Sequence, residues 1–154
     1  MSTLLIAAQT AVALLTPGQR LMGLDLGTKT IGIATSDLTR QIATPRETIA
    51  RSKFKADVAR VLEIGAAENI GLYVIGLPLN MDGTEGPRAQ STRSFQRNFT
   101  QQTGKAMVFW DERLSTAAVT RTMLEADLSR AKRARHVDKL AAAYILQGML
   151  EAVG

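Results

Sequence analysis

Short apolar runs separated by polar turns dominate the first half of the chain. The runs 20–26 and 31–37 flank the polar segment 27–30 and predict two strands joined by a hairpin. A third strand is predicted over 41–49, where Pro45 favours the edge of a sheet because proline cannot donate a hydrogen bond to a neighbouring strand. The pattern therefore predicts three antiparallel strands at the start of the main domain.

Helical patterns alternate with two further strands in the second half. The continuous apolar run 71–77 is typical of a strand buried on both faces, and 105–110 predicts the next strand. Helices are predicted in four places: after an N-cap at Ser52, from Pro87 to Gly104, from Ser115 to about Leu128, and over about 136–152. This order predicts an α/β fold with a mixed five-stranded sheet, three antiparallel strands followed by parallel crossovers, flanked by helices. Sites in such sheets form at the carboxyl ends of the parallel strands.

An apolar stretch over 4–15 precedes this pattern and stops at Pro17. It is too short to span a membrane, and it lacks the positive charge that begins a signal peptide, because the first basic residue is Arg20. We therefore interpret residues 1–18 as an apolar arm or helix and residues 19–154 as a single domain, with the cytoplasm as the expected location. The arm is a candidate dimer contact, so either a monomer or a homodimer is expected.

Composition narrows the possible partners. The net charge of +5 favours a polyanion such as nucleic acid. The absence of cysteine and the single histidine exclude a thiolate zinc site, so any metal site must be built largely from oxygen ligands, which suits Mg²⁺ or Mn²⁺. Aromatic residues are few, so we expect recognition of the backbone and shape of structured nucleic acid rather than base stacking.

Three carboxylates occupy positions that suit a metal site for phosphodiester cleavage. Asp25 lies within the first predicted strand, Glu112 directly follows the last strand, and Asp138 lies near the start of the last helix. A charge in the middle of a buried strand is costly unless it is paired, and the run around Asp25 contains no basic residue of its own. Two divalent ions about 3.5–4 Å apart, held by these carboxylates, would activate water and stabilise the leaving oxygen.

Each carboxylate also has a purely structural interpretation. Acidic residues such as Glu112 are common after a strand, and Asp138 in a first helical turn complements the helix dipole. Three other acids compete for a place in the site: Asp37, Asp82 and Asp111. Because Asp111 and Glu112 alternate faces if the strand continues, only one of them can point toward Asp25, and periodicity leaves the choice open.

With these residues in place, the chain resembles the YqgF family over about Arg20 to Leu150. Members of this ribonuclease H-like family are named as Holliday-junction resolvases and as pre-16S rRNA nucleases. Four motifs carry the resemblance: Leu24-Asp25-Leu-Gly-Thr-Lys29-Thr-Ile-Gly-Ile-Ala34, Gly76-Leu-Pro78 with Asp82-Gly83, Asp111-Glu-Arg-Leu-Ser-Thr116, and Val137-Asp138-Lys-Leu-Ala-Ala142 with Ile145-Leu-Gln147. The resemblance implies a ribonuclease H-like fold with Asp25, Glu112 and Asp138 as catalytic and metal-binding acids, and it favours Glu112 over Asp111.

Basic residues near these acids are candidates for contacts with backbone phosphates. They lie at the hairpin tip, at the start of the helix after Pro87, beside Glu112 and in a run before the last helix: Lys29, Arg88, Arg113, Lys132, Arg133, Arg135 and His136. A solvated linker is the alternative for the run, and Arg113 could instead pair with an acid. His136 could shuttle a proton near neutral pH, although a lone histidine at a helix start is more often exposed or bound to phosphate.

The expected function is a metal-dependent nuclease that hydrolyses phosphodiester bonds in structured nucleic acid. The family resemblance alone favours the 5′ end of precursor 16S rRNA over a four-way DNA junction, with the assembling small ribosomal subunit as a further expected partner. A junction resolvase and a non-catalytic nucleic-acid-binding factor in ribosome assembly or transcription are the alternatives. The segment 25–29 is also similar to the phosphate loop of sugar kinases and actin-like ATPases, but those proteins use two such domains and this chain has room for one.

Overall fold

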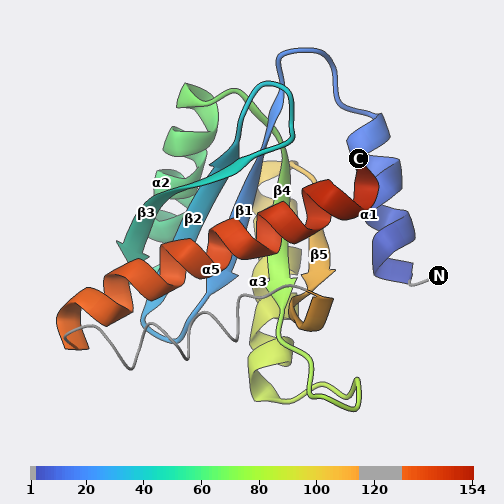
Figure 1. The fold of residues 1–154 in the computed structure, drawn as a ribbon. Helices are drawn as coiled ribbons and strands as arrows, with labels where there is room; N and C mark the ends of the chain where they lie inside the picture. Colours follow the sequence, from blue (N-terminus) through green and yellow to red (C-terminus); the bar gives the residue numbers. More distant parts are fainter. Residues whose placement is uncertain (1–2, 115–129) are drawn as a thin grey trace.

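Five strands form one mixed sheet in the order β3-β2-β1-β4-β5 (Figure 1). The computed structural model describes residues 3–114 and 130–154, and within 130–138 it describes the backbone path alone. The strands are β1 Arg20–Leu26, β2 Thr30–Ser36, β3 Ala43–Ala50, β4 Ile70–Leu77 and β5 Met107–Asp111. β1, β2 and β3 pair antiparallel, whereas β4 runs parallel to β1 and β5 parallel to β4. The predicted mixed sheet is therefore confirmed, including the place of Pro45 on the edge strand β3.

Helices cover both faces of this sheet. Figure 1 shows α5 crossing one face and α2 and α3 on the other, while α1 lies beside β5 and the end of α5. Their bounds are α1 Thr3–Ala13, α2 Phe54–Ala67, α3 Pro87–Thr103, the 3-10 turn η1 Glu112–Leu114 and α5 Arg130–Val153. None of the helices in the described ranges combines the length and the apolar composition that crossing a membrane requires.

Two helix starts differ from the prediction. The N-cap of α2 is Lys53 and not Ser52, because the Ser52 amide and hydroxyl both donate to the Asp57 carboxylate, at 3.0 and 3.3 Å. The last helix begins at Arg130 rather than near residue 136, so the basic run interpreted as a linker is helical. The helix predicted from Ser115 to Leu128 lies outside the described residues.

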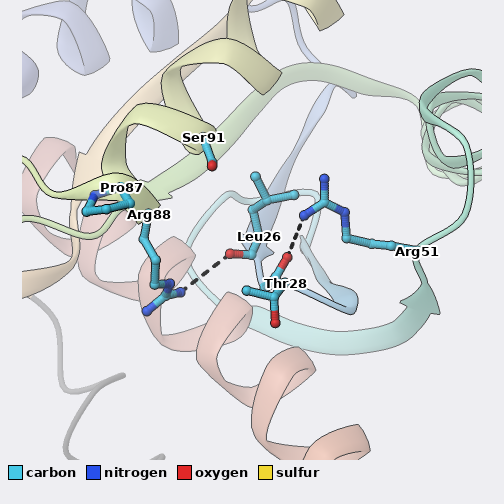
Figure 2. A pocket seen from close by; sticks show the side chains of 7 residues that line it. Leu26, Thr28, Arg51, Pro87, Arg88 and Ser91 are labelled. Atoms are coloured by element: carbon cyan, nitrogen blue, oxygen red, sulfur yellow. Dashed lines mark hydrogen bonds between the residues drawn. The ribbon is translucent and has the colours of Figure 1, made fainter.

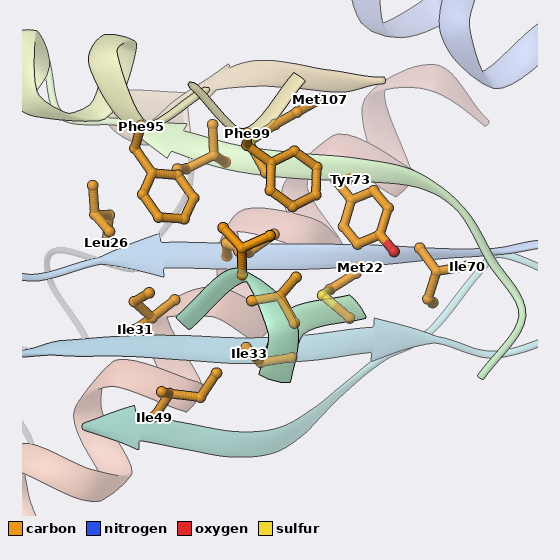
Figure 3. Close-up of a cluster of buried hydrophobic side chains, with 14 residues drawn as sticks. Met22, Leu26, Ile31, Ile33, Ile49, Ile70, Tyr73, Phe95, Phe99 and Met107 are labelled. Carbon is orange, nitrogen blue, oxygen red and sulfur yellow. The ribbon is translucent and has the colours of Figure 1, made fainter. Parts of the chain in front are cut away.

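Alternation along β1 divides the hydrophobic core into two layers. Met22, Leu24 and Leu26 face α2 and α3, where Phe99 and Tyr73 pack with ring centroids 5.1 Å apart (Figure 3). The residues between them belong to the opposite face, where Leu21 packs in the layer beneath α5. Asp25 shares this second face, so the fold places its carboxylate on the side of the sheet that α5 covers.

The helix α5 approaches β1 at a glycine. A Cβ atom at Gly23 would lie 2.8 Å from Cβ of Leu146 and 2.9 Å from the carbonyl oxygen of Ala142. Both distances are shorter than ordinary van der Waals contact, and the carbonyl belongs to the helix backbone, which cannot rotate away as a side-chain end can. The absence of a side chain at Gly23 therefore sets how closely α5 can lie on the sheet.

We expect Gly23→Ala to lower the free energy of unfolding by about 1–3 kcal/mol, because the added methyl group must push α5 away from the sheet. Chemical denaturation followed by circular dichroism measures the change. The matched control is Gly71→Ala, on β4, whose added Cβ would meet the side-chain ends of Gln19 and Leu15. Equal stability of Gly23→Ala and the control would show that α5 does not depend on this close contact.

Candidate active site

Asp25 is a buried carboxylate surrounded by glycines. Its side chain lies on the α5 face near the carboxyl end of β1, and the residue is 1% exposed. In the register of the sheet it pairs with Gly32 of β2, and the pairing of Leu24 with Ile75 places Gly76 of β4 on its other side. Residues directly beside one another on neighbouring strands share a face. The residues directly beside Asp25 on both neighbouring strands are therefore glycines, which carry no side chain.

Glu112 reaches toward the same place from β5. It is the first residue of η1, directly after the end of the strand. A Cβ atom at Gly76 would lie 3.0 Å from Cγ and 3.1 Å from Oε1 of Glu112, so the glutamate side chain lies directly over this glycine. Gly76 is thus beside Asp25 and beneath Glu112. The structure brings these two predicted acids to one face of the sheet, at the carboxyl ends of its central parallel strands.

Asp111, the rival of Glu112, has a different environment. It lies on the same face of β5 as Met107, which packs in the layer beneath α2 and α3. Its carboxylate accepts hydrogen bonds from Nη2 of Arg113 at 2.7 Å and from the Arg113 amide at 2.9 Å. The Asp111 carboxylate raises the pKa of the Arg113 guanidinium, mainly through these side-chain hydrogen bonds. The geometry therefore gives Glu112 the place near Asp25 that periodicity left open.

Arg113 was predicted either to contact a phosphate or to pair with an acid, and in the structure it pairs with Asp111. Besides Asp111, its Nη1 donates to the carbonyl oxygen of Met81 at 3.2 Å. The side chain therefore ties the end of β5 to the loop 78–86 that follows β4. This contact fixes the segment that carries Glu112 relative to the neighbouring strand.

The remaining competitors have local structural roles. Asp37 follows β2, at the opposite end of the strands from Asp25. Hydrogen bonds, of which that from the Thr39 hydroxyl has the largest effect, lower the pKa of its carboxyl to about 2. Asp82 lies in the exposed loop after β4, and hydrogen bonds from the hydroxyl and the amide of Thr84 lower the pKa of its carboxyl. Both carboxylates stabilise turns of their own segments.

The third predicted acid, Asp138, is placed by its backbone alone. It lies in α5 one turn before Ala142, the residue whose carbonyl oxygen lies against Gly23. The side chain of Asp138 lies outside the described residues, as do those of Lys132, Arg133, Arg135 and His136 in the same helix. Among the side chains that the structure does describe, no group of three or more acids or histidines is close enough to hold a metal ion.

Three of the described basic residues lie around the turn after β1. Lys29 is exposed at the tip of the β1–β2 hairpin, and Nη2 of Arg88 donates to the carbonyl oxygen of Leu26 at 3.4 Å. The sequence analysis missed Arg51, whose Nη1 donates to the carbonyl oxygen of Gly27 at 2.6 Å. The signal that could have identified it is its place directly after β3, because an antiparallel neighbour of the hairpin must end beside the hairpin tip.

The chain is similar to known proteins over most of its length. The profile of the RuvX family, described as Holliday junction resolvase, matches residues 19–152. A protein of Methylocella silvestris named "Putative pre-16S rRNA nuclease" is 59% identical over 135 residues, which cover 88% of this chain and 84% of that protein. A protein of the same name from Paramagnetospirillum magneticum is 54% identical over 147 residues, which cover 96% and 95% of the two chains.

The fold is similar to that of a solved RuvC structure. The structure titled "T. thermophilus RuvC in complex with Holliday junction substrate" matches with a TM-score of 0.53 and covers 86% of this chain and 94% of that one. Its sequence identity of 14% is low, so this likeness concerns the fold alone.

Proposed function

The chain belongs to the RuvX family, as the resemblance of its motifs to YqgF proteins indicates, and from this premise we propose that it is a nuclease that hydrolyses phosphodiester bonds in structured nucleic acid. Asp25, Glu112 and Asp138 are its proposed catalytic acids. The observation that carries the proposal is the place of Gly76, beside the buried Asp25 and beneath the side chain of Glu112. The names of the curated relatives favour precursor 16S rRNA as the substrate. Cleavage at its 5′ end is part of the proposal and rests on the family resemblance.

The two described acids fit a divalent metal ion. Their oxygen atoms are the ligands that Mg²⁺ and Mn²⁺ prefer, and carboxylates that converge on one place repel one another unless a cation lies between them. The glycine at position 76 leaves room that a methyl group would take from Glu112. Asp25 and Glu112, with Asp138 of α5, are the residues that would hold one or two such ions. Bound there, the ions would supply Lewis-acid chemistry at the scissile phosphate.

The chain itself orients these groups. Asp25 is fixed by its place on a central strand, where neighbours on both sides hold the backbone. Glu112 is fixed by the turn η1, which Arg113 ties to Asp111 and to the loop after β4. Such preorganised carboxylates do not have to reorient during the reaction. Lys29 and Arg88, at the same edge of the sheet, would attract and position the backbone of the substrate.

A four-way DNA junction is the second candidate substrate, because the matching family profile is described as Holliday junction resolvase. Symmetric cleavage of a junction needs two active sites and therefore a dimer. A monomer that cleaves precursor RNA fits the first proposal, and a dimer that cleaves the junction fits the second.

We expect the wild-type protein to cleave a 5′-extended precursor of 16S rRNA in Mg²⁺ or Mn²⁺, and Asp25→Asn to lower the cleavage rate about 100-fold or more. The loss follows because the amide keeps the shape of the side chain but removes its charge. Asp37→Asn is the control, since Asp37 lies at the opposite end of the strands from Asp25 and should leave the rate unchanged. A four-way DNA junction is assayed in parallel, and cleavage of the junction alone would transfer the proposal to that substrate. Cleavage of neither substrate, with metal-independent binding by both proteins, would contradict a nuclease and favour a binding factor.

We expect Gly76→Ala to lower kcat about 10- to 100-fold, because the methyl group would displace the Glu112 side chain, and small misplacements of catalytic groups are costly. The same methyl group would lie 2.5 Å from Cδ1 of Ile145, so the melting temperature should also fall. Steady-state cleavage is measured below the melting temperature of both variants, with Gly71→Ala on the same strand as the control. A folded Gly76→Ala variant with the wild-type kcat would show that the position of Glu112 over this glycine does not matter for the reaction.

A further inference from the structure

A pocket of about 170 Å³ opens at the carboxyl end of β1, and Figure 2 shows side chains that line it. It lies between the turn after β1 and the first turns of α3, and its walls are residues 26–28, Arg51, Pro87, Arg88 and Ser91. Leu26 is the residue that follows Asp25, and consecutive residues of a strand point to opposite faces. The pocket therefore begins one residue beyond the proposed catalytic acid, around the same edge of the sheet.

Two arginines converge on this pocket from different elements. Arg51 follows β3 and donates from Nη1 to the carbonyl oxygen of Gly27 at 2.6 Å. Arg88 lies in the first turn of α3 and donates from Nη2 to the adjacent carbonyl oxygen, that of Leu26, at 3.4 Å. Each guanidinium carries five N–H groups, so one bond to the turn orients it and leaves further donors for another acceptor.

The charge of these two arginines is not balanced by a salt bridge within the described part of the chain. Other arginines of the described ranges do form salt bridges with carboxylates: Arg20, Arg46, Arg60, Arg93 and Arg113. The exposed Lys29 lies at the tip of the same turn. Among the residues that the structure describes, Arg51, Arg88 and Lys29 thus bring three positive charges without a salt bridge to the surroundings of the pocket.

The pocket continues along α3 as a groove that both polar residues and the rings of Phe54 and Phe95 line. A second hollow of about 380 Å³ shares Arg51 and Ser91 with it and extends past Ser94 to Asn98. These α3 residues recur at helical spacing and present hydroxyl and amide groups along one side of the helix. The described residues that line the two hollows include no aspartate or glutamate. We call the two hollows together the α3 groove.

We propose that Arg51 and Arg88 hold a backbone phosphate of the substrate next to the scissile one, and that the α3 groove carries the strand away from the acid site. The inference rests on the proposed nuclease function. It adds a phosphate site between the turn after β1 and the start of α3. Guanidinium groups bind phosphate through paired, charge-assisted hydrogen bonds, and the start of α3 contributes the positive end of its helix dipole. Because the described lining of the α3 groove contains no aspartate or glutamate, it would not repel the phosphates of a nucleic acid.

The test measures binding rather than cleavage, in Asp25→Asn protein without divalent metal. Fluorescence anisotropy follows a labelled 5′-extended precursor RNA over a series of KCl concentrations. We expect Arg51→Met and Arg88→Met each to weaken binding about tenfold and to reduce the slope of log Kd against log salt by about 1. The double variant should lose less affinity than the product of the fold-losses of the two single variants, because both arginines hold the same phosphate.

The matched control is Arg97→Met, which removes the same charge from an exposed residue of α3 that lines neither hollow and donates from Nη2 to the Ser94 hydroxyl at 3.4 Å. Its affinity should change less than twofold. A single uncharged methylphosphonate linkage next to the cleavage site should weaken binding by the parent protein but not weaken it further in Arg51→Met. Melting temperatures equal to that of the parent exclude misfolding.

The possible outcomes separate this inference from the proposed function. Variants at 51 and 88 that bind like Arg97→Met, with an unchanged salt slope, overturn the phosphate site even if the wild type cleaves RNA. Weaker binding by the two pocket variants supports the site even if the wild type cleaves nothing. If the Asp25→Asn parent binds neither the precursor RNA nor a four-way DNA junction, the phosphate site is also overturned.

Discussion

The close approach of α5 to the central strands is the constraint on which the rest of the structure depends. The helix backbone lies against β1 at Gly23, and the side chain of Ile145 lies over β4 at Gly76. A side chain at either position would meet α5, so the helix would have to lift from the sheet. The same absence of side chains leaves room beneath the helix for Glu112 and beside the buried Asp25. Packing and the candidate site therefore share one geometric cause.

Acidic and basic groups lie close to one another at the carboxyl end of β1. On the α5 face lie the carboxylates that suit metal ions, and around the same end of the strand lie Arg51 and Arg88 of the pocket. The guanidinium groups of Arg51 and Arg88 donate to the carbonyl oxygens of Gly27 and Leu26 and form no salt bridge with the described carboxylates. A strand of nucleic acid that crosses the end of β1 could contact both kinds of group. On the other side of the site, Arg113 forms a salt bridge with Asp111, and Glu112 is the acid whose side chain lies over Gly76.

Most of the fold could be predicted from the sequence, because its strands are short apolar runs bounded by turns and its crossovers are amphipathic helices. The buried place of Asp25 also followed from its position within such a run. Periodicity alone could not decide between Glu112 and Asp111, because the direction of the side chains at the end of β5 depends on how η1 turns after it; only the family resemblance favoured Glu112. The N-cap at Lys53 depends on the reach of Asp57, and the pocket at Arg51 depends on a register between distant segments. Local patterns contain none of these tertiary contacts.

The most direct test of the account is to locate a bound metal ion by paramagnetic NMR. Mn²⁺, added to ¹⁵N-labelled protein at a small fraction of the protein concentration, should broaden the amide signals of residues 25, 76, 112 and 138 before others. Excess Mg²⁺ should reverse the broadening, and Asp25→Asn should abolish it. Broadening centred on exposed acids such as Asp37 and Asp82, or an unchanged pattern in Asp25→Asn, would contradict a metal site at these carboxylates.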